Sequence, residues 1–195
     1  MISFFKEIEN VIQKAVINDF QRIMEEIGKE SVYSIALVTD SDCITLYLAV
    51  NTYEYMKKKD AEYEILYKDM YSKKQVEMLK NGSLCITKWI PSEWGYSDGN
   101  KSELNKLSKL LYTKRASLSS EKLQEYTNSF FETVTSAFQK LIEQNIFHAY
   151  SDEITYFISI SDDARTPSVE NFSAKILNSE QNYAKFLKRT EGWDF

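Results

Sequence analysis

Carboxylates in two segments have the clearest chemical potential in this sequence. Glu93 lies between two tryptophans in the segment KWIPSEWGY, and Asp162 and Asp163 are adjacent in SISDDARTPS. An aspartate pair after a strand can bind a divalent metal or share a proton, and a glutamate can act as a general acid or base. One hypothesis is therefore a metal-dependent enzyme that uses these three residues.

The same carboxylates also have a structural explanation. Adjacent side chains project in different directions, aspartates before helices often form turns, and Arg165 is near enough along the chain to pair with one of them. No further ligand motif stands beside the aspartate pair. We therefore predict no metal, no cofactor and no catalytic residue, and we favour a non-enzymatic role while leaving catalysis open.

Other reactive residues are sparse. The two cysteines, Cys43 and Cys85, lack metal-ligand spacing, and His148 is the one histidine. The sequence has no phosphate-binding glycine loop and no GxSxG motif. These features disfavour a disulfide scaffold, a zinc site and the commonest nucleotide-binding and hydrolase classes.

The tryptophans of KWIPSEWGY favour packing over ligand binding. Trp89 is expected to end a strand that Pro91 halts, Ser92 to cap the following turn, and Trp94 to lie at a bulky corner between a sheet and a helix. Buried aromatic residues are far commoner than cofactor platforms. A small-molecule pocket behind this corner, in a regulatory domain, is a further alternative.

Composition and charge limit the function classes. A chain of 195 residues with 43% hydrophobic and 27% charged residues is typical of a folded domain and not of a disordered one. No apolar run approaches the roughly 20 residues needed to cross a bilayer, and the start does not resemble a secretory signal. The net charge is −5, and both ends of the chain are acidic. We predict a cytoplasmic protein that binds neither nucleic acid nor membrane and that could take a basic protein partner.

Residue periodicity predicts the elements that position these side chains. Apolar residues from Phe5 to Ile27 recur every three or four positions and predict a long helix that Gly28 ends. The following β-branched segments predict a hairpin with its turn at Asp40-Ser41-Asp42. Further expected elements are a tyrosine- and lysine-rich helix from Thr52 to about Lys80, open to a break near residues 57–60, a strand at 83–90, helices at 102–115 and from 119 through 141, a strand at 153–160, and helices at 167–178 and 179–189.

This order predicts one α+β domain, residues 1–195, with a mostly antiparallel sheet of about four or more strands packed by long helices. The helix at 53–80 mixes tyrosines and lysines, which fits either a protein interface or a half-buried helix with lysine tips in water. The pattern leaves both interpretations open.

Three segments together resemble a bacterial family catalogued as domain of unknown function 4303. They are VYSIALVTDSD through LYLAVNTYEYM, then KWIPSEWGY, then FISISDDARTPSVENFSAKILN, in the family's order. The resemblance implies an α/β sandwich-like domain without established catalytic residues. Because such families often occur among bacterial toxin–immunity loci, it also implies a cytosolic protein that binds and blocks a toxin.

These observations lead to one favoured hypothesis. The chain is expected to be a non-enzymatic protein-binding module, such as an immunity protein against a basic toxin, of unknown oligomeric state. Its acidic loops and aromatic residues would steer and hold the partner. The candidate binding surface consists of Asp40, Asp42, Glu93, Trp94, Asp162, Asp163 and Arg165.

Overall fold

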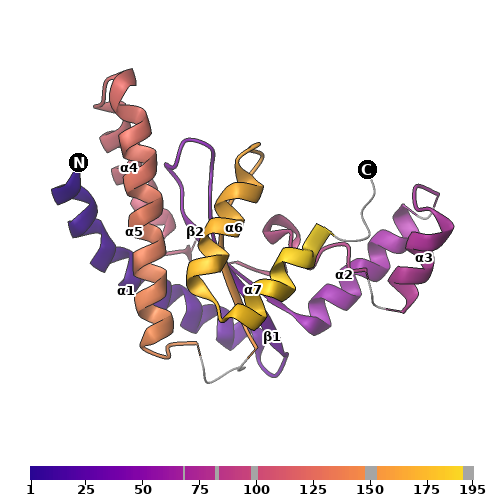
Figure 1. Ribbon diagram of the computed structural model, residues 1–195. Helices are drawn as coiled ribbons and strands as arrows, with labels where there is room; N and C mark the ends of the chain where they lie inside the picture. Colours follow the sequence, from indigo (N-terminus) through magenta and orange to yellow (C-terminus); the bar gives the residue numbers. More distant parts are fainter. Residues whose placement is uncertain (68, 82–83, 98–100, 148–152, 191–195) are drawn as a thin grey trace.

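The computed structural model describes residues 1–67, 69–81, 84–97, 101–147 and 153–190 (Figure 1). A four-stranded sheet lies between two groups of helices, so the predicted α+β class is confirmed. The strands are β1 (Val32–Thr39), β2 (Tyr47–Thr52), β3 (Tyr96–Ser97) and β4 (Thr155–Ile160). The α-helices are α1 (Ile2–Ile27), α2 (Tyr53–Leu66), α3 (Lys73–Lys80), α4 (Ser108–Ala116), α5 (Leu123–Glu143), α6 (Thr166–Leu177) and α7 (Glu180–Leu187).

The sheet is mixed. In the order β3-β2-β1-β4, the pairs β1–β2 and β2–β3 are antiparallel, while β1 and β4 run parallel from Ser34↔Thr155 to Thr39↔Ile160. The predicted hairpin is confirmed. A parallel pair needs a long crossover connection, and here that connection contains α2 to α5.

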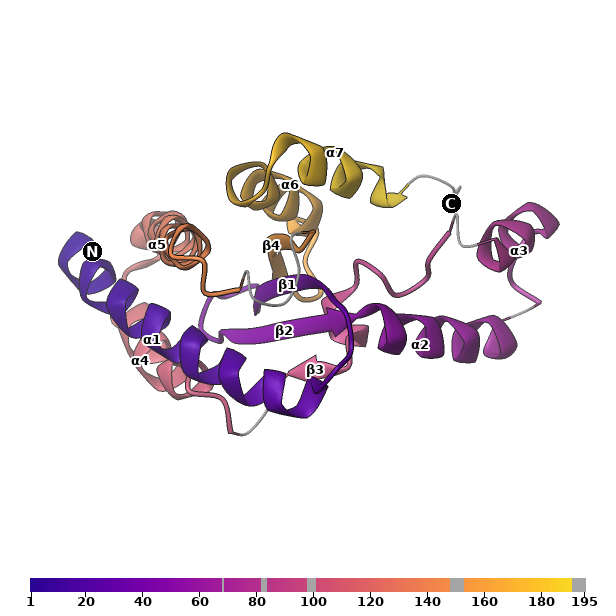
Figure 2. The same cartoon turned by 90° about the horizontal axis from the view of Figure 1, so that it is seen from below.

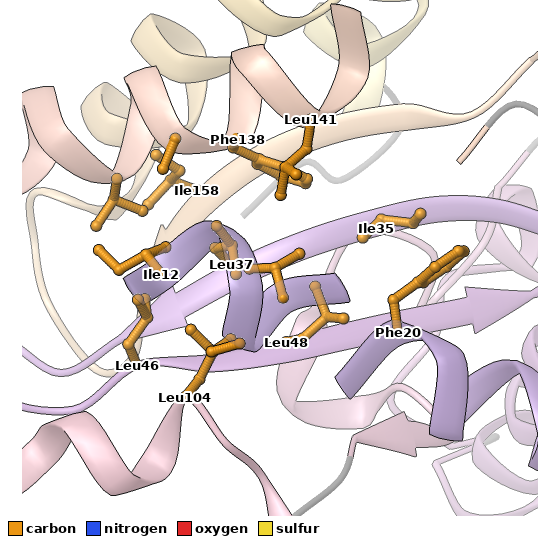
Figure 3. Packing of buried hydrophobic residues seen from close by; sticks show 14 of the residues in the cluster. Ile12, Phe20, Ile35, Leu37, Leu46, Leu48, Leu104, Phe138, Leu141 and Ile158 are labelled. Carbon is orange, nitrogen blue, oxygen red and sulfur yellow. The ribbon is translucent and has the colours of Figure 1, made fainter. Parts of the chain in front are cut away.

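The two faces of the sheet carry separate cores because successive strand residues point to opposite sides. Ile35 and Leu37 of β1 face the larger core, which α1, α4 and α5 cover (Figure 3). Ala36 and Val38 face a smaller core with Trp94, Ala174 of α6 and Phe186 of α7. Burial on both faces explains why the strands read as continuous apolar runs.

The strand predicted at 83–90 is wrong for its described part. Residues 84–90 are irregular, and β3 instead forms beyond Pro91, where Tyr96 pairs with Val50. The carboxylate of Asp60 accepts the backbone N–H groups of Ile86 (3.1 Å) and Thr87 (2.8 Å). These donors are therefore satisfied by a side chain and not by a strand ladder.

The helix predicted from Thr52 to Lys80 divides in two, but not near residues 57–60. Thr52 caps α2 as expected by accepting the N–H of Tyr55 (3.1 Å), and α2 continues to Leu66. A new helix, α3, begins after Ser72, which forms a capping box with Gln75. Figure 2 shows α2 and α3 extending away from the sheet. We call residues 53–81 the arm.

No described helix is long and apolar enough to cross a membrane. The expectation for a cytoplasmic location stays a prediction.

Candidate functional site

The parallel pair β1–β4 brings the two acidic loops together. Residues 40–46 follow β1 and residues 161–165 follow β4, and the carboxyl ends of parallel strands meet at the same edge of a sheet. Arg165 Nη2 donates to the carbonyl oxygen of Ser41 at 2.7 Å and joins the loops. We call residues 40–46 and 161–165 the loop end.

Most charges of the loop end are used within the molecule. Asp40 accepts the N–H groups of Asp42 (2.8 Å) and Ile44 (3.4 Å) and the hydroxyl of Thr45, so its carboxylate shapes its own loop. Asp42 Oδ1 lies 2.6 Å from Nη2 of Arg115. Asp42, although exposed, is therefore already paired with a cation.

Asp163 and Arg165 form a second pair within this end. The guanidinium donates from Nε at 2.9 Å and from Nη2 at 2.6 Å to the two carboxylate oxygens. These hydrogen bonds lower the pKa of Asp163 to about 2. Asp162 is exposed and adopts a φ of 52°, so it turns the chain between β4 and α6.

A groove of about 350 Å³ lies beside the loop end. Its lining includes Trp89, Pro91, Asp162, Asp163 and Glu170. We call it the acidic groove. Trp94 does not line it, so of the two indoles in the segment KWIPSEWGY only that of Trp89 lies beside the aspartates.

Trp94 lies inside the protein. Its side chain is 7% exposed, its ring centroid is 5.6 Å from that of Phe157, and Nε1 donates to the carbonyl of Thr87 at 3.2 Å. Trp89 is half-buried, with its ring 5.2 Å from that of Phe186. Trp94 is thus part of the smaller core and is not available for a surface contact.

The predicted cap of the tryptophan corner is wrong. Residues Pro91–Glu93 form a 3-10 turn without a side-chain cap, so Ser92 does not have the role we expected.

Glu93 is directed toward the arm and not toward the aspartate pair. Its Oε2 accepts the hydroxyl of Tyr63 at 2.6 Å and lies 3.9 Å from Nζ of Lys59. The hydrogen bond to Glu93 is the main cause that raises the pKa of Tyr63 to about 12. Glu93 is absent from the residues that line the acidic groove. The three carboxylates of the metal hypothesis are therefore not brought together.

The reactive side chains give no support to metal or thiolate chemistry. Within the described residues, no group of three His, Cys, Asp or Glu side chains could hold a metal ion. Burial raises the pKa of the Cys43 thiol to about 12, which opposes formation of the nucleophilic thiolate. His148 lies outside the described residues.

The base of the arm is fixed to the body of the protein. Glu54 accepts the N–H of Ser31 at 2.8 Å, and Asp60 and Tyr63 make the contacts described above. The ring of Tyr55 lies against Gly95, where an added Cβ would come within 2.5 Å of it. Four separate contacts thus hold α2 along its first three turns.

The far end of α2 is different and was missed by the sequence reasoning. Met56 is the one buried residue among the described side chains of α2, and the helix ends in a group of exposed apolar residues. We call this group the tip: Ile65, Leu66, Tyr67 and Met70. The sequence does contain a sign of this group. The segment EILYKDM, at the end of α2 and just beyond it, has several apolar residues although α2 has no clear apolar face.

Comparison with protein families matches residues 12–179 to the family described as Domain of unknown function (DUF4303). A search of curated proteins and a search of solved structures each found no match. The matched region contains all four strands and the helices from α2 to α6. Because the match covers well over half of the sequence, this chain belongs to the DUF4303 family.

Proposed function

We propose that this protein is a non-enzymatic protein-binding module, of the kind represented by toxin-neutralising immunity proteins, and that the tip of the arm is its main contact surface. The carrying observation is the concentration of exposed apolar side chains there. Ile65, Leu66 and Met70 are 75%, 67% and 78% exposed and lie within six residues of one another.

Apolar exposure of this kind favours an interface. Single exposed apolar residues are normal, but a contiguous group often marks a protein interaction site. Methionine and aromatic residues are enriched in interface cores, and the tip contains Met70 and Tyr67. The tip is also held by a fixed base, so little freedom of the arm would be lost on binding.

The loop end has a smaller role in this proposal than its residue types indicated. Asp42 and Asp163 already have arginine partners at 2.6 Å, which leaves Asp162 as the exposed aspartate with no hydrogen bond or ion pair among the described residues. The net charge of −5 would still speed the approach of a basic toxin, and added salt would weaken that effect. A cytoplasmic location is part of the proposal.

Co-expression with the product of the neighbouring gene tests this function. The wild-type chain is expected to co-purify with that product and to protect cells from its toxicity. A variant with Ile65→Ser, Leu66→Ser and Met70→Ser should lose both properties. The matched control carries Leu110→Ser and Tyr112→Ser on α4, where two exposed apolar residues lie far from the arm in the sequence. It should keep both.

Three outcomes would contradict the proposal. They are no co-purification by the wild-type chain, equal binding by the tip variant, and loss of binding in the α4 control alone. Size-exclusion chromatography addresses a fourth possibility. A dimer that the tip substitutions dissociate would assign the tip to self-association instead.

A further inference from the structure

A second cavity, of about 230 Å³, lies next to Trp89. The same indole lines both this cavity and the acidic groove. Its walls come from the start of β1, the start of α2, the irregular segment 84–89 and the end of α7. Residues that matter to its chemistry are Tyr33, Tyr53, Lys88, Lys185, Lys188 and Arg189. We call it the cationic cavity.

The lining is strongly positive in a chain whose net charge is −5. It has four cationic side chains and one carboxylate, Glu153. Two of the cations are compensated, because Lys185 Nζ lies 3.6 Å from Glu153 and Arg189 Nη2 lies 3.3 Å from Glu170. Lys88 and Lys188 have no carboxylate partner among the described residues. A bound anion would supply the negative charge that compensates these two lysines.

Lys88 is held in position by aromatic rings. Its Nζ lies 5.1 Å from the ring centroid of Trp89 and 5.9 Å from that of Tyr33. The hydroxyl of Tyr33 donates to the backbone carbonyl of Lys88 at 2.8 Å and accepts from Asn51 Nδ2 at 2.9 Å. The ammonium group therefore loses less conformational freedom on binding than a solvated lysine would.

Tyr53 provides a flat surface beside these cations. Its ring centroid is 4.8 Å from that of Tyr33, and the residue is 37% exposed. Aromatic residues stack with other rings in offset or tilted arrangements. The volume is below the roughly 300–1,000 Å³ of typical ligand sites, which favours a compound with a single ring.

We propose that the cationic cavity binds a small organic anion in which a phosphate, phosphonate or carboxylate group is attached to one planar ring. Lys88 and Lys188 hold the anionic group, and Tyr53 contacts the ring. No residue of the tip lines this cavity. The proposed anion site is therefore independent of the proposed protein-binding function, and an experiment can contradict one without contradicting the other.

Isothermal titration calorimetry on the purified full chain tests this site with three probes. Phenylphosphonate carries the ring and the anion, methylphosphonate carries the anion alone, and benzyl alcohol carries the ring alone. We expect phenylphosphonate to bind with a Kd of about 1 mM or lower. Methylphosphonate should bind about tenfold more weakly, and benzyl alcohol should not bind measurably.

Substitutions locate the site. The double variant Lys88→Gln/Lys188→Gln should weaken phenylphosphonate binding about tenfold or more, since charge-assisted hydrogen bonds are lost. The backbone carbonyl that holds Tyr33 remains in this variant, and its Tm serves as the folding check. Lys109→Gln on α4 removes one exposed lysine from another helix and should leave the Kd unchanged.

The proposal is overturned if phenylphosphonate does not bind at millimolar concentration, or if the double variant binds it as well as the wild type. Equal affinity for methylphosphonate and phenylphosphonate would also overturn it, because the ring would then add nothing. Perturbation of the Tyr53 and Lys88 amide signals in a two-dimensional NMR titration, without perturbation of the loop end, would support it.

Discussion

The loop end and the tip of the arm are two surfaces with opposite relations to the rest of the molecule. At the loop end, Asp42 and Asp163 are charged residues whose arginine partners lie 2.6 Å away. At the tip, Ile65 and Met70 are apolar residues that are 75% and 78% exposed. Charge alone therefore does not identify a binding surface, because a charged side chain that is already paired within the protein interacts less strongly with a binding partner.

The difference follows from where each region lies in the fold. The two loops of the loop end are joined because the parallel strands bring them together and Arg165 bonds from one loop to the other. The arm leaves the sheet after β2 (Figure 2), and Glu54 and Tyr63 at its base bind the body of the protein. Four experiments test whether the first region contributes to stability while the second is free for binding.

The largest expected effect concerns the ion pair between Arg189 and Glu170, which lines the acidic groove beside the loop end. Glu170 and Arg189 have side chains that are 8% and 9% exposed, and Ser159 donates to Glu170 at 2.8 Å. Glu170→Ala should lower the free energy of unfolding by about 3 kcal/mol, because Arg189 is left buried without its partner. Urea denaturation measures this change. Lys59→Ala, which removes the half-exposed pair with Glu93 at the base of the arm but leaves the hydrogen bond from Tyr63 to Glu93 in place, should lower it by less than about 1 kcal/mol. Equal losses of unfolding free energy in the two variants would contradict the expected difference between the buried and the half-exposed ion pair.

A smaller loss of stability is expected from Asp40→Ala. This side chain is partly buried and accepts three hydrogen bonds within the loop that follows β1. Its removal should lower the free energy of unfolding by about 1–3 kcal/mol. Asp162→Asn is the matched control, since asparagine tolerates the positive φ of that exposed position, and it should change stability by less than about 0.5 kcal/mol. A larger loss of unfolding free energy in Asp162→Asn than in Asp40→Ala would show that the hydrogen bonds of Asp40 are not what stabilises the loop.

The pH dependence of stability should reveal the Asp163–Arg165 pair. The folded pKa of Asp163 is about 2, below its ordinary value of 3.8. The pair therefore stabilises the fold fully above pH 4, and this contribution is lost as the pH falls from about 4 toward 2. Tm curves should fall less steeply over that range in Asp163→Asn than in the wild type. Glu62→Gln removes one exposed carboxylate from the arm and should retain the steeper wild-type slope. Parallel curves for the wild type and Asp163→Asn would count against the pair.

The smallest effect is expected at the tip. Ile65→Ser and Met70→Ser together should change the free energy of unfolding by less than about 0.5 kcal/mol, because both side chains are mostly exposed in the folded protein. Chemical denaturation of the purified variant measures this. A loss above about 1 kcal/mol would mean that the tip packs within the molecule, and its role as a free contact surface would then have no basis.

Local patterns in the sequence were sufficient for much of the fold. The apolar stripe of α1, its end at Gly28, the β1–β2 hairpin and β4 all follow from periodicity and turn residues. Packing of the tryptophan corner was also predictable in part, and Trp94 lies in the smaller core. These features depend on residues that are near one another in the chain, or on hydrophobicity itself.

Long-range contacts decided the rest. The strand expected at 83–90 is absent from its described part because Asp60, more than twenty residues earlier, takes its backbone donors. Asp42 is paired with Arg115 of α4, which lies 73 residues later in the sequence. The Asp163–Arg165 pair is local, and its possibility was already visible in the sequence. The sequence by itself determined which segments become helices and hairpin strands, since periodicity and turn chemistry act locally. Only the tertiary structure decided which distant charges are paired, such as Asp42 with Arg115, and which apolar residues stay exposed, because both depend on how distant segments meet.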